Sequence, residues 1–132
     1  MTPKPVRKGF QCVVPFLSIQ GAERLVEFLI AAFDAKETFR SKTHFEVRIG
    51  DSMVMIGDVG DRPPTTGQLF MYVEDADALY KRAMQVGAIS LMEPSDRPWG
   101  EGEEMMHAAG VKDPCGNSWF LAGPKCVSER LR

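Results

Sequence analysis

The 132-residue sequence has little cysteine, and the cysteines that it has do not form a recognisable framework. Cys12, Cys115 and Cys126 are odd in number and include no C-x-x-C pair. This argues against a disulfide scaffold and against a thiolate zinc site. We therefore expect free thiols in a reducing compartment, and hence a cytoplasmic location.

The sequence also lacks a basic run and a long apolar run. Sixteen basic against eighteen acidic residues give a formal charge of −2, so nucleic acid is a poor candidate partner. No segment approaches the length of a membrane span, and the N-terminus lacks the apolar stretch of a secretory signal. With 44% hydrophobic and 26% charged residues, the chain is expected to form one soluble domain over residues 1–132.

The stretch from Gln68 to Pro94 predicts a strand, a helix and a second strand. An apolar run of strand length ends at Val73, Asp75 follows at an N-cap position, and Gly87 supplies a left-handed stop. Between these two signals, apolar residues recur at helical spacing on one face. They are Ala76, Leu79, Tyr80, Ala83 and Val86.

The same order of elements occurs earlier in the chain. A strand-length run from Val13 to Ile19 precedes Gly21, which opens a helix with its own apolar stripe. The members of this stripe are Leu25, Phe28, Leu29, Ala32 and Phe33. We interpret the two copies as duplicated modules, about 11–60 and about 67–123, each with a strand, a helix and three strands.

A β-hairpin in the first module predicts two chemically distinct faces. Gly50-Asp51 is a two-residue turn with glycine first, which would pair Ile49 with Ser52 and fix the register. One face is then apolar: Phe45, Val47, Ile49, Val54 and Ile56. The other combines polar groups with flexible thioethers, as a ligand-facing wall would: His44, Glu46, Arg48, Met53 and Met55.

The remaining segments are assigned from turn residues and strand-length runs. Two loops rich in proline and glycine are predicted at 57–68 and 93–104, and Trp99 in the second either closes the core or contacts ligand. Strands are predicted for MMHAAGVK and NSWFLAG, joined by a turn at 113–116. Residues 1–10 and 124–132 are expected to lie loosely on the surface and to carry no chemistry.

Five pieces of the sequence, in this order, resemble one known superfamily. They are SIQGAERLVEFLIAAFDA, HFEVRIGDSMVMIGD, YVEDADALYKRAMQVGA, MEPSDRPWG and KDPCGNSWFLA. The superfamily is that of the glyoxalases, bleomycin-resistance proteins and extradiol dioxygenases, also called vicinal oxygen chelate proteins, and the branch resembled is termed demethylubiquinone methyltransferase-like. The resemblance implies an α+β fold of paired βαβββ modules, a curled mixed sheet with a concave ligand cavity, and a homodimer.

The resemblance also locates the positions at which metal-using relatives carry their ligands. Carried onto this chain, these positions fall at Val14, Met55, Gln68 and Phe120. Valine and phenylalanine cannot bind a divalent cation, and methionine suits only soft metals, so we expect no metal and no cofactor. His44 and Glu46 could hold a metal only with a third ligand, which the sequence does not supply.

Two classes of function follow. In the first, the protein binds or sequesters an aromatic or amphipathic small molecule, with stacking surface and adaptable contacts from the walls. The expected ligand-binding residues are Phe16, His44, Glu46, Arg48, Met53, Met55, Gln68, Phe70, Tyr72, Trp99 and Phe120. In the second, it is a lyase-, isomerase- or dioxygenase-like enzyme with His44 or Glu46 as the proton-transfer group, or with a relocated metal site. The sequence does not determine which strand face His107 uses.

Overall fold

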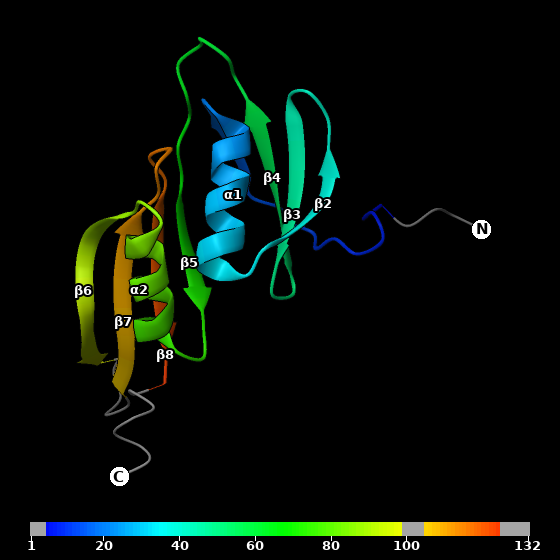
Figure 1. Ribbon diagram of the computed structural model, residues 1–132. Coiled ribbons are helices and arrows are strands. Elements are labelled where there is room, and N and C mark those ends of the chain that lie inside the picture. The colour runs from blue at the N-terminus through cyan, green and yellow to red at the C-terminus, as the bar shows by residue number, and fades with distance from the viewer. Residues whose placement is uncertain (1–4, 99–104, 125–132) are drawn as a thin grey trace.

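The chain folds as two βαβββ modules in an α+β architecture (Figure 1). The computed structural model describes residues 5–98 and 105–124. The first module consists of β1 (Phe16–Ile19), α1 (Ala22–Phe33), β2 (Lys36–Arg40), β3 (His44–Ile49) and β4 (Ser52–Asp58). The second consists of β5 (Gln68–Tyr72), α2 (Ala76–Gln85), β6 (Ile89–Pro98), β7 (Met105–Lys112) and β8 (Ser118–Gly123).

Each module forms its own four-stranded mixed sheet. The strand orders are β1-β4-β3-β2 and β5-β8-β7-β6, so β1 and β5 occupy equivalent edge positions. In each sheet this edge strand pairs in parallel with the last strand of its module, and the other pairs are antiparallel. The predicted duplication and fold class are therefore confirmed.

The turn at Gly50 sets the register of the β3–β4 hairpin as predicted. Gly50 adopts a φ of 59°, a left-handed conformation that glycine tolerates without steric cost, and Ile49 pairs with Ser52. Val47 and Val54 then face each other in the core beneath α1. The predicted apolar face of this hairpin is confirmed.

Both helices have the boundaries that their end signals predict. Asp75 caps α2 by accepting a hydrogen bond from the backbone N–H of Ala78 at 3.1 Å. Gly21 stands at the N-cap of α1 with a φ of 78°. The predicted stripe of α1 is buried throughout, which ties this helix to the first sheet.

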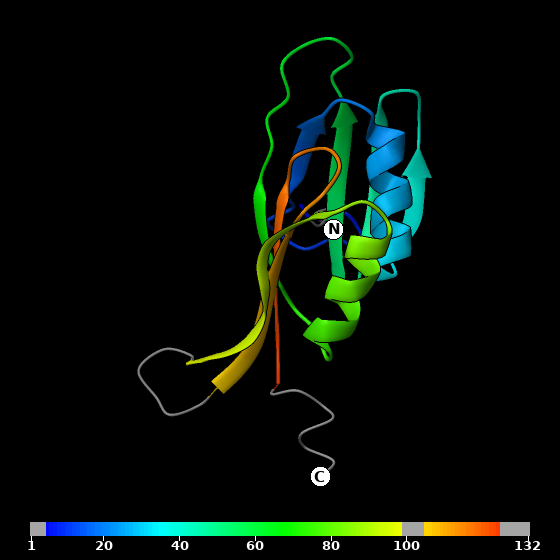
Figure 2. The same cartoon turned by 60° about the vertical axis from the view of Figure 1, so that its left-hand side comes forward.

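The two modules pack against each other through their helices, which lie side by side in Figures 1 and 2. The ring centroids of Phe33 and Trp119 are 5.3 Å apart, so one residue of each module contributes to a shared core. At the surface, Arg82 of α2 makes an ion pair with Asp34 at 2.7 Å. No helix within the two described ranges is long and apolar enough to cross a membrane.

The second module is closed by a buried carboxylate at the turn between β7 and β8. Asp113 accepts hydrogen bonds from the backbone N–H groups of Cys115 and Asn117, from the amide of Asn117, and from the indole of Trp119. Asn117 in turn accepts from the backbone N–H of Gly67, just before β5. These bonds fix Trp119 at the junction between the modules.

Two predicted boundaries were wrong. β1 begins at Phe16 and not at Val13, and β6 continues to Pro98 although a loop was predicted from residue 93. β6 is an edge strand with irregular pairing between Ser90 and Ser95. Prolines are tolerated at such edges and irregularities because no ladder hydrogen bond is required of their nitrogen.

Candidate functional site

Each sheet has one face packed under its helix and an opposite face, which we call its open face. The open face of the first sheet carries all six residues that the sequence predicted there: Phe16, His44, Glu46, Arg48, Met53 and Met55. They alternate in sequence with the residues that face the helix, as the pleat requires, although Glu46 and Met53 of the open face are themselves buried. Phe16 on β1 lies beside Met55 on β4 in the register of the sheet.

Glu46 is the buried charge of this open face. Its side chain is only 4% exposed and is held by two hydrogen bonds from Arg7, at 3.1 and 3.3 Å, and one from His44 Nε2, at 3.1 Å. Burial alone would raise the pKa of Glu46, but the hydrogen bonds from Arg7 and His44 hold it below the ordinary value of a glutamate. The carboxylate is therefore charged at neutral pH.

Aromatic rings surround the Glu46–His44 pair. The imidazole of His44 lies 5.6 Å from the ring of Phe16 and 6.1 Å from the ring of Phe39, between centroids. Gly57 leaves room for Phe16, since a Cβ there would come within 3.0 Å of the ring. Phe16 itself is 54% exposed, so it offers a flat apolar surface beside the imidazole of His44.

The segment of residues 5–11 runs along the open face of the first sheet, behind β3 and β4 in Figure 1. Gln11 donates to the carbonyl of Met53 at 2.7 Å and accepts from its N–H at 3.1 Å. Arg48 donates to the carbonyl of Gly9 at 3.3 Å, and the guanidinium of Arg7 lies 4.3 Å from the ring of Phe10. This segment also pairs with Glu46 through Arg7.

The expectation that residues 1–10 lie loosely on the surface was therefore wrong for Arg7 and Gly9, which hydrogen-bond to Glu46 and Arg48, whereas the expectation that they carry no chemistry stays a prediction. A single arginine in a segment without periodicity gives no signal that it will meet a particular carboxylate 39 residues away. The residues before Pro5 lie outside the described range.

The open face of the second sheet carries the predicted residues Gln68, Phe70, Tyr72 and Phe120. The rings of Phe70 and Tyr72 are 5.2 Å apart, and Phe70 is the register partner of Phe120. Gly110 on β7 accommodates Phe120, because a Cβ there would approach the ring to 3.0 Å. A small apolar pocket of about 220 Å³ lies on this face, with lining residues that include Phe70, Met92, Arg97, Met106 and Phe120.

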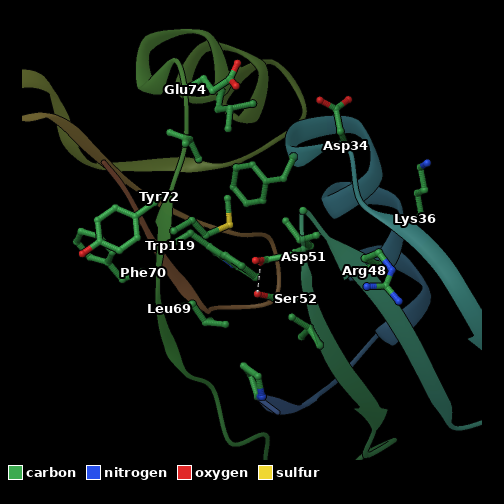
Figure 3. A pocket seen from close by; sticks show the side chains of 18 of the residues that line it. Asp34, Lys36, Arg48, Asp51, Ser52, Leu69, Phe70, Tyr72, Glu74 and Trp119 are labelled. Atoms are coloured by element: carbon green, nitrogen blue, oxygen red, sulfur yellow. Dashed lines mark hydrogen bonds between the residues drawn. The ribbon is translucent and has the colours of Figure 1, made fainter. Parts of the chain in front are cut away.

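A larger crevice of about 1050 Å³ lies between the modules. Its walls come from β5 and the start of α2 on one side and from the β3–β4 turn on the other (Figure 3). Arg48, Phe70 and Tyr72 of the predicted site line it, and Figure 3 shows Phe70 and Tyr72 on the far side of β5 from Trp119. His44, Glu46, Met53 and Met55 line neither this crevice nor the small pocket.

Two further residues considered from the sequence have different outcomes. Trp99 lies outside the described residues. His107 does not lie on the open face: its Nδ1 contacts Asp96 at 2.8 Å and its Nε2 contacts Asp77 of α2 at 2.9 Å. This places His107 on the helix-covered side of the second sheet.

The cysteines in the described ranges are free thiols. Cys12 is exposed and Cys115 is half-buried, and burial raises the pKa of Cys115 to about 11. Its thiolate population at neutral pH is therefore small, and Cys115 is a poor nucleophile. Cys126 lies outside the described residues.

The donor set does not fit the metal centre that the sequence resemblance implied. Val14 precedes β1, Met55 pairs with Phe16, Gln68 pairs with Ser118, and Phe120 pairs with Phe70. The four positions therefore offer an aliphatic side chain, a thioether, one amide and a phenyl ring, where a divalent ion would require several nitrogen or oxygen donors. Across residues 5–98 and 105–124, no three or more His, Cys, Asp or Glu side chains are grouped to hold a metal.

Comparison with known proteins identifies the family. The sequence profile of the Glyoxalase/Bleomycin resistance protein/Dioxygenase superfamily matches residues 13–121. The chain belongs to this superfamily. It is 28% identical to the uncharacterized protein Mb0911c of Mycobacterium bovis, over 83% of this chain and 81% of that protein. It is also 28% identical to the uncharacterized protein Rv0887c of Mycobacterium tuberculosis, over 83% of this chain and 72% of that one.

Solved structures of other proteins share the fold at lower identity. TioX from Micromonospora sp. ML1 is 22% identical with a TM-score of 0.69, over 89% of this chain and 98% of TioX. The fosfomycin resistance protein FosX from Mesorhizobium loti is 21% identical with a TM-score of 0.58, over 92% and 98% of the two chains. At this identity the likeness establishes the fold alone.

Proposed function

We propose that this superfamily member binds an aromatic or amphipathic small molecule on its open faces, without a metal. The observation that carries the proposal is the buried, charged Glu46 beside the flexible side chain of Met55, which in turn lies beside the exposed ring of Phe16. Rings provide stacking area, a thioether adapts to irregular shapes, and one fixed polar group orients a ligand.

We also propose that two copies of the chain complete the site. Within one chain the two open faces belong to separate sheets, and β1 and β5 are edge strands. The exposed fractions of Phe16, Phe70 and Tyr72 on these strands are 54%, 51% and 70%. Apolar edge strands favour association, and a two-fold dimer would place β1 of each protomer beside β5 of its partner. Each composite site would then combine both kinds of open face.

A catalytic role is the second candidate, because His44 and Glu46 form a hydrogen-bonded pair at 3.1 Å. The carboxylate orients the imidazole through this hydrogen bond, so the pair could transfer a proton to or from a bound substrate. A lyase-, isomerase- or dioxygenase-like reaction would require this pair, whereas binding alone would not.

The finer assignments belong to the same proposal. The five sequence pieces support a place in the demethylubiquinone methyltransferase-like branch. Free thiols at Cys12 and Cys115 fit a reducing compartment such as the cytoplasm. The formal charge of −2 gives no reason to add nucleic acid as a partner.

Isothermal titration with a neutral aromatic probe, 2-naphthamide, tests the binding proposal. We expect the wild-type protein to bind it, and Met55→Ala to weaken the binding about fivefold or more through lost apolar contact. Met84→Ala is the matched control, because Met84 is an exposed methionine on α2, and it should leave the affinity unchanged. Absence of binding to the wild type, or equal losses in both variants, would reject the proposal.

A further inference from the structure

The two residues of the Arg7–Glu46 ion pair differ in burial and in how firmly the fold fixes them. The side chain of Arg7 is 66% exposed, whereas that of Glu46 is 4% exposed. Glu46 lies in the middle of β3, paired to Met55 on one side, and its carbonyl accepts a hydrogen bond from Thr38 on the other. Arg7 comes from an irregular segment outside the sheet. The carboxylate is therefore fixed and the guanidinium is the replaceable partner.

The surroundings of Glu46 are arranged for a planar cation. Arg7 approaches with both terminal nitrogens, one to each carboxylate oxygen, which is the paired geometry that guanidinium and amidinium groups share. The same guanidinium lies over the ring of Phe10 at 4.3 Å, and the rings of Phe16 and Phe39 flank the neighbouring His44. A cation attached to an aromatic body would find both a counter-charge and stacking surface here.

Without Arg7, the buried carboxylate of Glu46 would keep only its hydrogen bond from His44. A buried carboxylate that loses its partner carries a desolvation cost that a neutral or anionic ligand group cannot offset. An anionic ligand would in addition be repelled by the charge on Glu46. The ligand that replaces Arg7 most readily is therefore one that carries its own positive charge.

We propose that Glu46 recognises the cationic group of the ligand, an amidinium, guanidinium or ammonium on an aromatic body, and that Arg7 occupies this position until the ligand displaces it. This inference rests on the proposed binding function and specifies its ligand class. Residues 5–11 then act as an internal competitor: the apparent affinity is reduced by the fraction of molecules in which Arg7 holds the site. Removing Arg7 should therefore tighten the binding of a cation.

Titration of three naphthyl probes of different charge tests the proposal. We expect the wild-type protein to bind the cation 2-naphthamidine about tenfold more tightly than the neutral 2-naphthamide, and the anion 2-naphthoate most weakly. Glu46→Gln should abolish the preference for the cation, so that 2-naphthamidine and 2-naphthamide bind this variant with similar affinity. Arg7→Gln should raise the affinity for 2-naphthamidine about threefold to tenfold. These two variants are predicted to act in opposite directions.

Arg24→Gln is the matched control for Arg7→Gln. It removes the same charge from α1, which covers the opposite side of the first sheet, and should change no affinity. Hydrogen exchange supplies a second readout. The backbone N–H of Phe10 donates to the carbonyl of Arg7 at 3.0 Å, and displacement of residues 5–11 would break this bond. Binding of 2-naphthamidine should therefore speed exchange at the amide of Phe10. Glu46→Gln should remove this effect.

The possible outcomes separate this inference from the proposed function. The cation proposal is wrong, and the binding function stands, if 2-naphthamide binds but 2-naphthamidine binds no more tightly. The same holds if Arg7→Gln lowers the affinity for 2-naphthamidine. If none of the three probes binds to the wild type or to Arg7→Gln, both are wrong. Equal effects of Arg7→Gln and Arg24→Gln would show a general charge effect and would also overturn the role of Arg7.

Discussion

At the scale of single residues, the two histidines have opposite surroundings. His44 is on the open face with one carboxylate, Glu46, whereas His107 is enclosed between Asp77 and Asp96. Burial lowers the pKa of His107, but its hydrogen bonds to the two aspartates outweigh burial and raise the pKa above the ordinary value of a histidine. Folding therefore favours the imidazolium form of His107.

This pKa shift predicts a pH-dependent contribution to stability. Because the folded-state pKa lies above the unfolded value of about 6.5, the contribution is fully present below that pH. It is lost as the pH rises through the folded-state pKa. We expect His107→Gln to lower the free energy of unfolding by on the order of 1–3 kcal/mol at pH 6 and by clearly less at pH 9.

Urea denaturation of the wild type and His107→Gln at both pH values measures this difference. His44→Gln serves as a control for the loss of a histidine that contacts a single carboxylate on the open face. An equal loss of stability in His107→Gln at pH 6 and pH 9 would mean that the imidazolium form is not what stabilises the fold.

Residue positions were predictable where one strand face was apolar and the other was not. Alternation along the strand assigned Glu46 to the open face, because its neighbour Val47 faces the core. The same pattern gave no sign that Arg7 is the partner of Glu46. His107 could not be assigned because both faces of β7 are rich in apolar residues. Its place beneath α2 is set by carboxylates from two other elements.

At the scale of elements, the local turn chemistry decided what could be predicted. The β3–β4 register followed from Gly50-Asp51, since a two-residue turn leaves little freedom to the flanking strands. The end of β6 did not follow from its prolines, because Pro94 falls in an irregular part of the strand and Asp96 still pairs with His107. Cross-strand pairing of this kind depends on residues distant in the sequence.

Gly123, at the end of β8, allows a close approach that predicts a sensitive position. A Cβ at this residue would lie 2.2 Å from the carbonyl oxygen of Val73, a backbone atom that cannot move without shifting the chain after β5. We expect Gly123→Ala to lower the free energy of unfolding by about 1–3 kcal/mol. Equilibrium denaturation measures this loss.

Gly67→Ala is the matched control for Gly123→Ala. A Cβ at Gly67 would meet the end of the Leu17 side chain at 3.1 Å, and a side chain can adjust where a backbone carbonyl cannot. The loss of stability should therefore be smaller. A loss in Gly67→Ala equal to that in Gly123→Ala would indicate that the approach to Val73 is not limiting.

At the scale of the whole molecule, duplication was predictable but the relative placement of the modules was not. The repeated order of strand and helix signals indicated two modules. Their arrangement depends on contacts between them, such as the Phe33–Trp119 pair and the ion pair of Arg82 with Asp34. For this reason the sequence predicted the residues of each open face without predicting how the two sheets are placed relative to each other.

The side chains at the four positions where metal-using relatives carry ligands predict a protein without a bound metal. Elemental analysis of untagged protein should find no stoichiometric zinc, nickel, manganese or iron. A chelator should leave the thermal midpoint unchanged, because there would be no metal-binding free energy to remove. A ratio near one metal per chain that is lost in the double variant His44→Ala, Glu46→Ala would instead establish a metal site at this pair.

In the proposed dimer, a ligand is held between the open face of the first sheet in one protomer and the open face of the second sheet in its partner. Met55 lies on β4 and Phe120 on β8, each one strand in from the edge strand that would form the dimer. Met55→Lys and Phe120→Lys should therefore each stop the protein from binding 2-naphthamide without removing an edge residue. Each variant homodimer then has both of its sites impaired.

Co-expression of the two variants with different affinity tags, followed by sequential purification, isolates the mixed dimer. In this dimer one composite site carries both substitutions and the other carries neither. Titration with 2-naphthamide should therefore find one binding site per mixed dimer, none in either parent homodimer, and two in a doubly tagged wild-type dimer. A mixed dimer that binds none, or a chain that forms no dimer to purify, would contradict the account.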